Sequence, residues 1–181
     1  MARYAAFLRG VNLGAKRKAS SSDLRATFEG LGYEDVATFR ASGNVIFEAG
    51  REAPAKMATR IETALAKALG YGVPAFVRTT AELRAIADHQ PFAASLVEAS
   101  AGKLQVAFFS TKPTTRGWKA LEALATDEDK LALEGRELYW LPSGGILDSA
   151  LDMNMIEKAL GPMTMRTKNT VDQIAAKYLS G

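Results

Sequence analysis

Residues 7–20 read FLRGVNLGAKRKAS and combine two glycines, one asparagine and three consecutive cations, all of which are suited to holding an anion. Lys16, Arg17 and Lys18 carry the positive charge, and the glycines relax the backbone so that amide groups can approach a ligand. Serines follow, which is typical of a helix start, and the amides and dipole of such a start favour negative charge. We therefore predict that this segment binds a phosphate group.

The segment differs from the phosphate-binding loop of nucleotide hydrolases. That loop has four residues between its glycines, then a lysine directly after the second glycine and a Ser or Thr for magnesium. Here three residues separate Gly10 from Gly14, Ala15 precedes Lys16, and Arg17 stands in the place of the hydroxyl residue. The segment therefore shares the glycines, the cations and the following helix start of that loop, but not the spacing of its residues.

Charge is distributed unevenly along the 181 residues, although the formal net charge is only +3. Five cations and one anion give residues 9–25 a local balance of +4, and six anions and two cations give residues 122–137 a balance of −4. Such a basic cluster attracts phosphate or nucleic acid with an affinity that falls as salt rises. Two other interpretations stay open: a solvated loop, or a loop that pairs with the acidic stretch of this chain or of a second copy.

Three arginines at or near predicted strand ends, Arg9, Arg40 and Arg166, are further candidates. If two modules share a cleft, these guanidinium groups can converge there as planar anion clamps, although strand-end arginines also pair with carboxylates. Asparagine and serine in the same motifs would be neutral donors, and their default role is to satisfy the backbone of turns. The complete set of predicted ligand-binding residues is Arg9, Gly10, Asn12, Gly14, Lys16, Arg17, Lys18, Arg40, Ser42, Asn44, Arg166 and Asn169.

The composition excludes several kinds of chemistry. The chain has no cysteine and a single histidine, His89, so disulfides, thiol nucleophiles and typical transition-metal sites are excluded. Ser42 lacks the glycine arrangement of a nucleophile elbow, and His89, next to Gln90 and Pro91, is interpreted as a cap at a surface helix end. Asp148 and Asp152 are interpreted as helix-start acids. We expect no catalytic residue, no metal site and no cofactor; magnesium carried by ligand phosphates stays compatible with the sequence.

The overall composition is that of a soluble globular protein. Apolar residues make up 48% and charged residues 24% of the chain. No run of about 18 apolar residues occurs, and the beginning of the chain lacks the pattern of a signal peptide. We therefore expect a cytoplasmic protein that does not bind membranes.

Apolar periodicity in the first half predicts the order strand, helix, strand, strand, helix, strand. Ser21 or Ser22 is expected to cap the first helix, and Pro54 to open the second. This order is typical of the ferredoxin-like plan, an antiparallel sheet with two helices on one face. The predicted strands are residues 4–9, 36–41, 44–48 and 73–78, and the predicted helices are residues 21–31 and 54–69.

A capping box at Thr79 and Glu82 predicts one more helix, and residues 95–102, which are small and polar, are predicted to separate two modules. The second half repeats the order of the first at an offset of roughly 100 residues. The sequence therefore predicts an α+β fold of two ferredoxin-like modules, residues 1–95 and 103–181. The predicted strands of the second half are residues 104–109, 131–134, 137–141 and 163–166, and its predicted helices start at Thr114 or Thr115, at Ser149 and near Val171.

RNA recognition was weighed because ferredoxin-like sheets are used for it. The phenylalanines of the predicted strands lack the glycine-aromatic signature of RNA-recognition modules, so we expect most of them to pack under helices. Tyr139 and Trp140 are neighbours in a predicted strand and point to opposite faces, so one of them is expected to be exposed or, alternatively, to mark the interface between the modules.

Three motifs together resemble one bacterial family, domain of unknown function 1697. They are RGVNLGAKRK at residues 9–18 with DLR at 23–25, SGNVIF at 42–47, and MTMRTKNTV at 163–171. The resemblance implies two ferredoxin-like modules and no established activity. The chain departs from the family pattern at Ala15, Arg17, Ala150 and residues 166–168, so a polar site at these family positions would be an altered version here.

The basic segment leads to the hypothesis of a non-catalytic protein that binds a phosphate-bearing small molecule or nucleic acid. One alternative is an enzyme that acts on a phosphorylated metabolite and uses lysine or arginine to stabilise transition-state charge. Another is a scaffold without ligand that binds partner proteins through open sheet edges. The sequence does not specify an oligomeric state.

Overall fold

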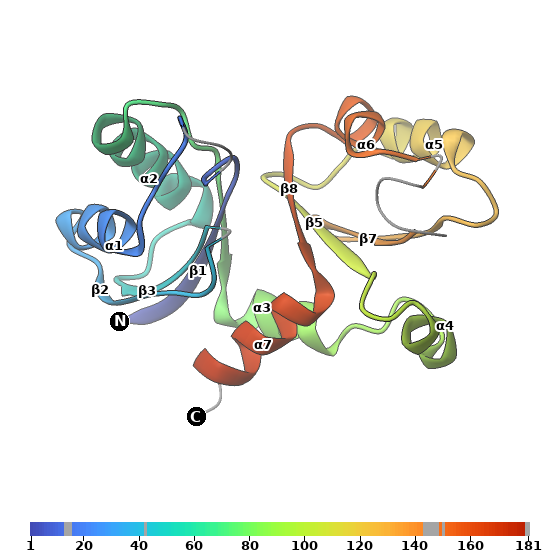
Figure 1. Ribbon diagram of the computed structural model, residues 1–181, viewed down its shortest axis with the longest axis horizontal. Helices are drawn as coiled ribbons and strands as arrows, with labels where there is room; N and C mark the ends of the chain where they lie inside the picture. The colour runs from blue at the N-terminus through green and yellow to red at the C-terminus, as the bar shows by residue number, and fades with distance from the viewer. Residues whose placement is uncertain (13–15, 42, 143–148, 150, 180–181) are drawn as a thin grey trace. The chain divides into compact units, whose positions relative to one another are not determined.

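The structure is a computed structural model that describes residues 1–12, 16–41, 43–142, 149 and 151–179. Contacts divide the chain into unit 1, Met1–Ala85 with Ala176–Gly181, and unit 2, Ile86–Ala175. Each unit contains a four-stranded antiparallel sheet, and the described residues form seven helices in all (Figure 1). The fold is therefore a mixed α+β fold. This division by contacts does not test which residues fold independently. The predicted modules, residues 1–95 and 103–181, therefore stay predictions.

The sheet of unit 1 has the strand order β2-β3-β1-β4. Its strands are β1 (Ala2–Leu8), β2 (Glu34–Thr38), β3 (Asn44–Ala49) and β4 (Ala75–Thr79). The central strand β1 is antiparallel to both neighbours, and Tyr4 lies opposite Phe47 of β3 and Thr79 of β4. Because β1 and β3 are inner strands, their residues are almost all buried.

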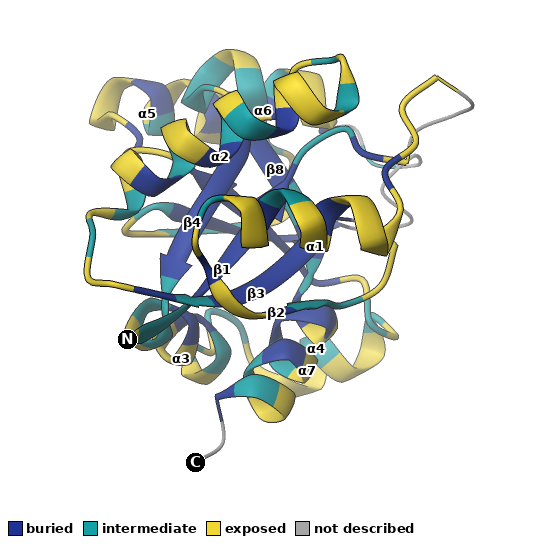
Figure 2. Ribbon diagram, turned by 90° about the vertical axis from the view of Figure 1, so that its left-hand side faces the viewer, coloured by how far each residue is buried: buried dark blue, intermediate teal, exposed yellow. Residues whose placement is uncertain are grey.

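Two helices, α1 (Ser21–Gly30) and α2 (Pro54–Leu69), cover one face of this sheet (Figure 1). Their buried side chains repeat at helical spacing and pack around Phe47, whereas their other faces are exposed (Figure 2). As predicted, Pro54 opens α2, and Gly70 ends it in a left-handed conformation with φ 81°. The helix residues of this core are Leu24, Phe28, Met57, Ile61 and Leu65.

Helix α3 (Thr80–Asp88) follows β4 directly, and the predicted capping box starts it. The Glu82 amide donates to the Thr79 hydroxyl at 3.2 Å, and the Thr79 amide donates to the Glu82 carboxylate at 2.8 Å. The cap of α1 is shifted from the prediction. Ser20, and not Ser21 or Ser22, is its N-cap residue.

The sheet of unit 2 has the strand order β6-β7-β5-β8. Its strands are β5 (Gln105–Phe109), β6 (Lys130–Glu134), β7 (Glu137–Leu141) and β8 (Met163–Thr167). Helices α5 (Thr115–Leu124) and α6 (Met153–Leu160) pack on its core, in which Leu121, Trp140 and Ile156 are fully buried. Thr114 caps α5 as predicted, accepting a hydrogen bond from the Gly117 amide.

Several local predictions for unit 2 are wrong. Helix α6 begins at Met153 with Asp152 as its N-cap, whereas the Ser149 hydroxyl donates to the Asp129 carboxylate and accepts from the Leu151 amide. Tyr139 and Trp140 are both buried, although they point to opposite faces of β7. Both faces of this strand are therefore covered, which single-strand alternation does not reveal.

Two more helices follow along the chain, α4 (Ala94–Ala99) in unit 2 and α7 (Lys168–Tyr178), which begins in unit 2 and ends in the residues assigned to unit 1. Helix α4 falls partly in residues 95–102, which were predicted to separate two modules and for which no helix was predicted. It is short and buries none of its residues, so it leaves no apolar stripe in the sequence. Among the described residues, no helix has the length and apolar character needed to cross a membrane.

Candidate functional site

The predicted phosphate-binding segment forms a loop between β1 and α1, and Asn12 closes it. The main-chain amide of Asn12 donates to the Arg17 carbonyl at 2.6 Å, and the side-chain oxygen of Asn12 accepts from the Ala19 main-chain amide at 2.9 Å. The side-chain nitrogen donates to the Ala41 carbonyl at 2.6 Å. Asn12 adopts a left-handed φ of 58°, which asparagine tolerates better than most residues. This asparagine therefore shapes the loop, as expected for a turn residue.

Arg17 lies along this loop instead of extending freely. Its guanidinium carbon is 5.4 Å from the centre of the Tyr71 ring, within the range of a cation–π contact. A Cβ atom on Gly10, which has φ 77°, would be 3.1 Å from an Arg17 nitrogen. The Tyr71 hydroxyl donates to the Lys18 carbonyl at 3.3 Å. Tyr71 thus holds both the loop backbone and one of its cations.

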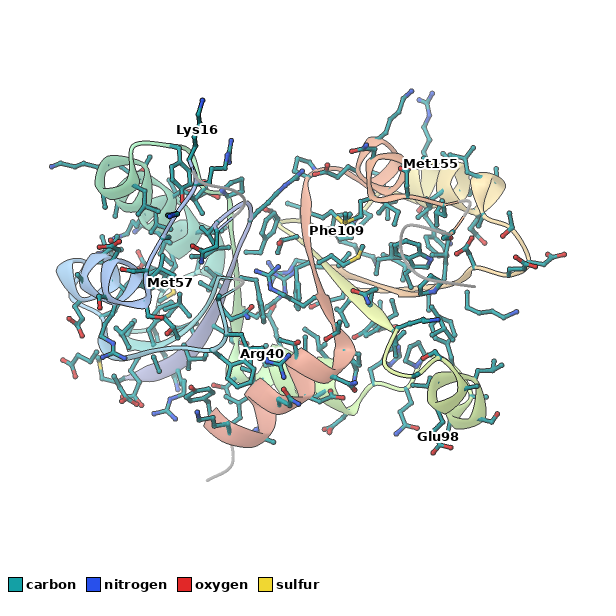
Figure 3. All side chains as sticks on the ribbon, in the orientation of Figure 1. Lys16, Arg40, Met57, Glu98, Phe109 and Met155 are labelled. Carbon is teal, nitrogen blue, oxygen red and sulfur yellow. The ribbon has the colours of Figure 1, made fainter. Side chains whose placement is uncertain are left out.

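Lys16, Arg17 and Lys18 are all exposed, and Figure 3 shows Lys16 extending away from the rest of unit 1. Within the described part of the chain, none of these three cations forms an ion pair with a carboxylate. Three positive charges on adjacent residues repel one another, and a bound anion would relieve that repulsion.

The start of α1 contributes less to this site than the sequence indicates. The Ser20 hydroxyl accepts from the Asp23 amide at 3.0 Å, and the Asp23 carboxylate accepts from the Ser20 amide at 3.4 Å. This capping box uses two amides of the helix start and places a negative charge there. The positive charge of this segment is therefore that of the side chains of Lys16, Arg17 and Lys18.

The other predicted site residues of unit 1 each make a different local contact. Arg9 is half-buried, and its main-chain amide donates to the Pro74 carbonyl at 2.9 Å. Arg40 is exposed with φ 61°, and its guanidinium carbon lies 5.4 Å from the centre of the Phe39 ring. Asn44 is buried, and its side chain donates to the Phe39 carbonyl at 2.8 Å. Asn44 therefore holds the β2–β3 turn.

Arg166 and Asn169 belong to unit 2, in β8 and α7. Arg166 is buried, and its Nη1 donates to the Thr164 hydroxyl at 2.8 Å and to the Met165 carbonyl at 2.9 Å. Burial lowers the pKa of Arg166 to about 10, because a low-dielectric surrounding disfavours the charged form. Asn169 is exposed. Convergence of Arg166 with the arginines of unit 1 stays a prediction; Gly14 and Ser42 lie outside the described residues.

Sequence reasoning missed a cavity of about 400 Å³ in unit 2, between the segment that follows α3 and the start of α7. His89, which was predicted to be a surface cap, is half-buried and lines this cavity; its ring centre is 4.8 Å from that of Tyr139. Lys168 is also buried here. Its i, i+4 spacing to Asp172 was the one available signal of a paired lysine.

Metal binding finds no support in the described residues. They contain no group of three or more His, Cys, Asp or Glu side chains arranged to hold a metal ion. What the described geometry offers chemically is a closed, exposed loop with three cations in unit 1 and a small cavity with mixed lining in unit 2.

Comparison with known proteins adds a family and a fold. The sequence model of the family described as "Protein of unknown function (DUF1697)" matches residues 1–139. No curated protein matches the chain. Among solved structures, the conserved bacterial protein SP0830 from Streptococcus pneumoniae superposes with a TM-score of 0.73 and 20% sequence identity, over 99% of each chain. At this identity the similarity concerns the fold alone.

Proposed function

Because the chain belongs to the DUF1697 family, whose function is unknown, we propose a function from its own residues: non-catalytic binding of a phosphate-bearing ligand by the loop of residues 10–19. The ligand class is a small phosphorylated molecule or a nucleic acid. We also interpret each unit as a ferredoxin-like module, because the first strand of each sheet lies between its third and fourth strands. The family match by itself indicates neither a phosphate-bearing ligand nor a ferredoxin-like topology.

The observation that carries the proposal is the exposed run Lys16, Arg17 and Lys18. In the described residues, hydrogen bonds from Asn12 and Tyr71 reach the Arg17 and Lys18 carbonyls, so the backbone at two of these cations is held by neighbouring residues. Cations on a held backbone lose less conformational entropy on binding than cations on a mobile one. Exposed ammonium and guanidinium groups without carboxylate partners keep their charge available for phosphate oxygens.

The proposal predicts binding that weakens steeply with salt. If the three cations each contact one phosphate of a single-stranded oligonucleotide, the logarithm of the affinity falls with a slope of about −2 against the logarithm of salt concentration. Between 50 and 200 mM salt the affinity then falls about 20-fold. Fluorescence anisotropy with a labelled oligonucleotide, and competition by inorganic polyphosphate and by nucleotides, measures this slope.

Charge reversal tests the residues. The triple variant K16E/R17E/K18E is expected to lose binding and the salt dependence with it, while its circular dichroism spectrum stays unchanged. The matched control K112E/R116E/K119E changes the net charge by the same amount at exposed cations of unit 2 and is expected to bind almost normally. Equal loss in both variants would mean that only net charge matters, and would reject the loop as the site.

Two outcomes would favour the alternatives. Thermal stabilisation by a single phosphorylated metabolite that persists in K16E/R17E/K18E would support an enzyme with its site elsewhere. Absence of any salt-sensitive binding, with each probe at millimolar concentration, would reject anion binding and leave the interaction scaffold.

A further inference from the structure

The cavity of unit 2 has a lining that differs in character from the basic loop. Apolar side chains form much of its wall, including Pro91, Phe92, Val97 and Leu104. Its volume of about 400 Å³ lies at the lower end of the range of small-molecule sites, about 300–1,000 Å³. The size and the apolar wall together fit a small ligand with an apolar body.

One pair of charges in the cavity wall neutralises itself. Lys168 is only 8% exposed, and its ammonium group donates to the Asp172 carboxylate at 2.7 Å and to the Ala87 carbonyl at 2.9 Å. A cation and an anion at this distance cancel most of each other's field beyond the pair. The pair therefore fixes the start of α7 against the end of α3, and leaves little net charge for a ligand.

Glu98 is the remaining charged group of the lining. It lies on α4, labelled in Figure 3, and among the described residues it forms no ion pair. His89 also lines the cavity and is counted as neutral, as in the formal charge of the whole chain at pH 7. The lining thus has a net charge of about −1 at neutral pH, which favours a cation and disfavours a carboxylate or phosphate ligand.

The backbone beside the cavity is held in an unusual conformation. Ala101 has φ 53° and Gly102 has φ 85°, two successive left-handed residues after α4. A Cβ atom on Gly102 would lie 3.1 Å from the Asn169 side-chain nitrogen, so a larger residue would crowd the wall. Left-handed backbone at a non-glycine residue costs free energy and persists where surrounding structure holds it, so this wall is preformed.

We propose that this cavity binds a small primary amine that carries an apolar or aromatic group. The ammonium group would pair with the Glu98 carboxylate and lie near the Phe92 ring, which attracts cations through its face. The apolar body would contact Val97 and Leu104. This proposal does not rest on the anion-binding function, because it concerns another unit and a ligand of the opposite charge.

Phenethylamine is a suitable probe, with N-acetylphenethylamine as its neutral counterpart and phenylacetate as its anionic one. Titration into ¹⁵N-labelled full-length protein is expected to shift amide resonances of residues 87–104 and 168–172 with the amine only. Calorimetry gives the affinity for each compound. Shifts confined to other residues, equal affinity for the neutral amide, or no shift with the amine at millimolar concentration would each overturn the proposal.

Two variants test the roles of charge and space. Glu98→Gln keeps the shape of the side chain and removes its charge, and it is expected to weaken amine binding about 3- to 5-fold, because an exposed ion pair contributes modestly. Glu122→Gln removes an exposed carboxylate of α5 and is the matched control, with unchanged affinity expected. Ala94→Trp places a large side chain in the cavity wall and is expected to abolish binding. Normal affinity in Glu98→Gln would refute the amine assignment even if Ala94→Trp failed to fold.

Discussion

Gly117 in α5 lies close against the backbone of α6, and Gly117→Ala tests this contact. A Cβ atom there would lie 2.4 Å from the Ala159 carbonyl oxygen of α6 and 3.1 Å from the Thr114 hydroxyl. Since such contacts are essentially never shorter than 3.0 Å, the two helices must separate by about 0.6 Å or distort. The substitution therefore strains a tightly packed helix pair.

Opposing effects set the expected magnitude. Alanine improves helix propensity over glycine by about 1 kcal/mol. Overpacking costs about 1–3 kcal/mol, and disturbing the Thr114 cap, which accepts from the Gly117 amide at 3.0 Å, costs about 1 kcal/mol more. The net expectation is a destabilisation of about 2 kcal/mol, which lowers the urea midpoint by about 1 M.

Urea unfolding followed by tryptophan fluorescence measures this change where it occurs. The two tryptophans of the chain, Trp118 and Trp140, both belong to unit 2. The matched control is Gly30→Ala at the end of α1, where a Cβ atom would have no neighbour within 4 Å, and it is expected to leave the midpoint by circular dichroism unchanged or slightly raised. If Gly117→Ala is as stable as the parent protein, helix packing does not require glycine and the steric argument is refuted.

Three further substitutions test particular contacts by urea unfolding followed by circular dichroism, which reports on both units. Tyr33→Phe removes a buried hydroxyl that has no hydrogen-bond partner among the described residues, and is expected to stabilise by about 1 kcal/mol. Burial also raises the pKa of Tyr33 above 10.0, so the unfolded chain loses this proton first and stability falls above about pH 10; the variant should lack that part of the alkaline loss. Gly43→Ala introduces a Cβ atom 2.6 Å from Val11 at φ 81°, and a loss of about 2–4 kcal/mol is expected; an unchanged midpoint would contradict the geometry. Trp140→Phe removes the indole hydrogen bond to the buried Asp129 carboxylate at 3.0 Å, with an expected loss of about 2 kcal/mol by circular dichroism; a loss below about 0.5 kcal/mol would mean that Asp129 does not need this donor.

Prediction from sequence was most successful where a pattern depends on local physics. The apolar stripe of α2 predicts the side chains that pack on the sheet, because helical periodicity places them on one face. The capping box of Thr79 and Glu82 is confirmed for the same reason, since it needs only residues three apart. The start of α6 was misplaced because Ser and Asp are both favoured N-cap residues, and residue type alone does not show that Asp152 is the one that accepts from the amide three positions later.

The candidate site was also predicted only where it depends on residues that are close in the sequence. The sequence shows Lys16, Arg17 and Lys18 directly as a cluster of positive charge. All three residues are exposed to solvent, as runs of like charge usually are. Its closure by Tyr71 was not predicted, because that contact joins residues 53 positions apart. The cavity beside Lys168 was not predicted either, because residues distant along the chain form its wall and no periodicity marks them.

By itself, the sequence determined most of the strands and helices, although not α4 or the start of α6. It also determined where charge accumulates and which chemistries the lack of cysteine excludes, because these depend on residue type and short-range spacing. Tertiary structure alone decided how β7 buries both Tyr139 and Trp140, which groups neutralise Lys168, and where an enclosed space remains. Burial and charge pairing are properties of groups brought together from distant parts of the chain, and their free energies exist only once those groups are in contact.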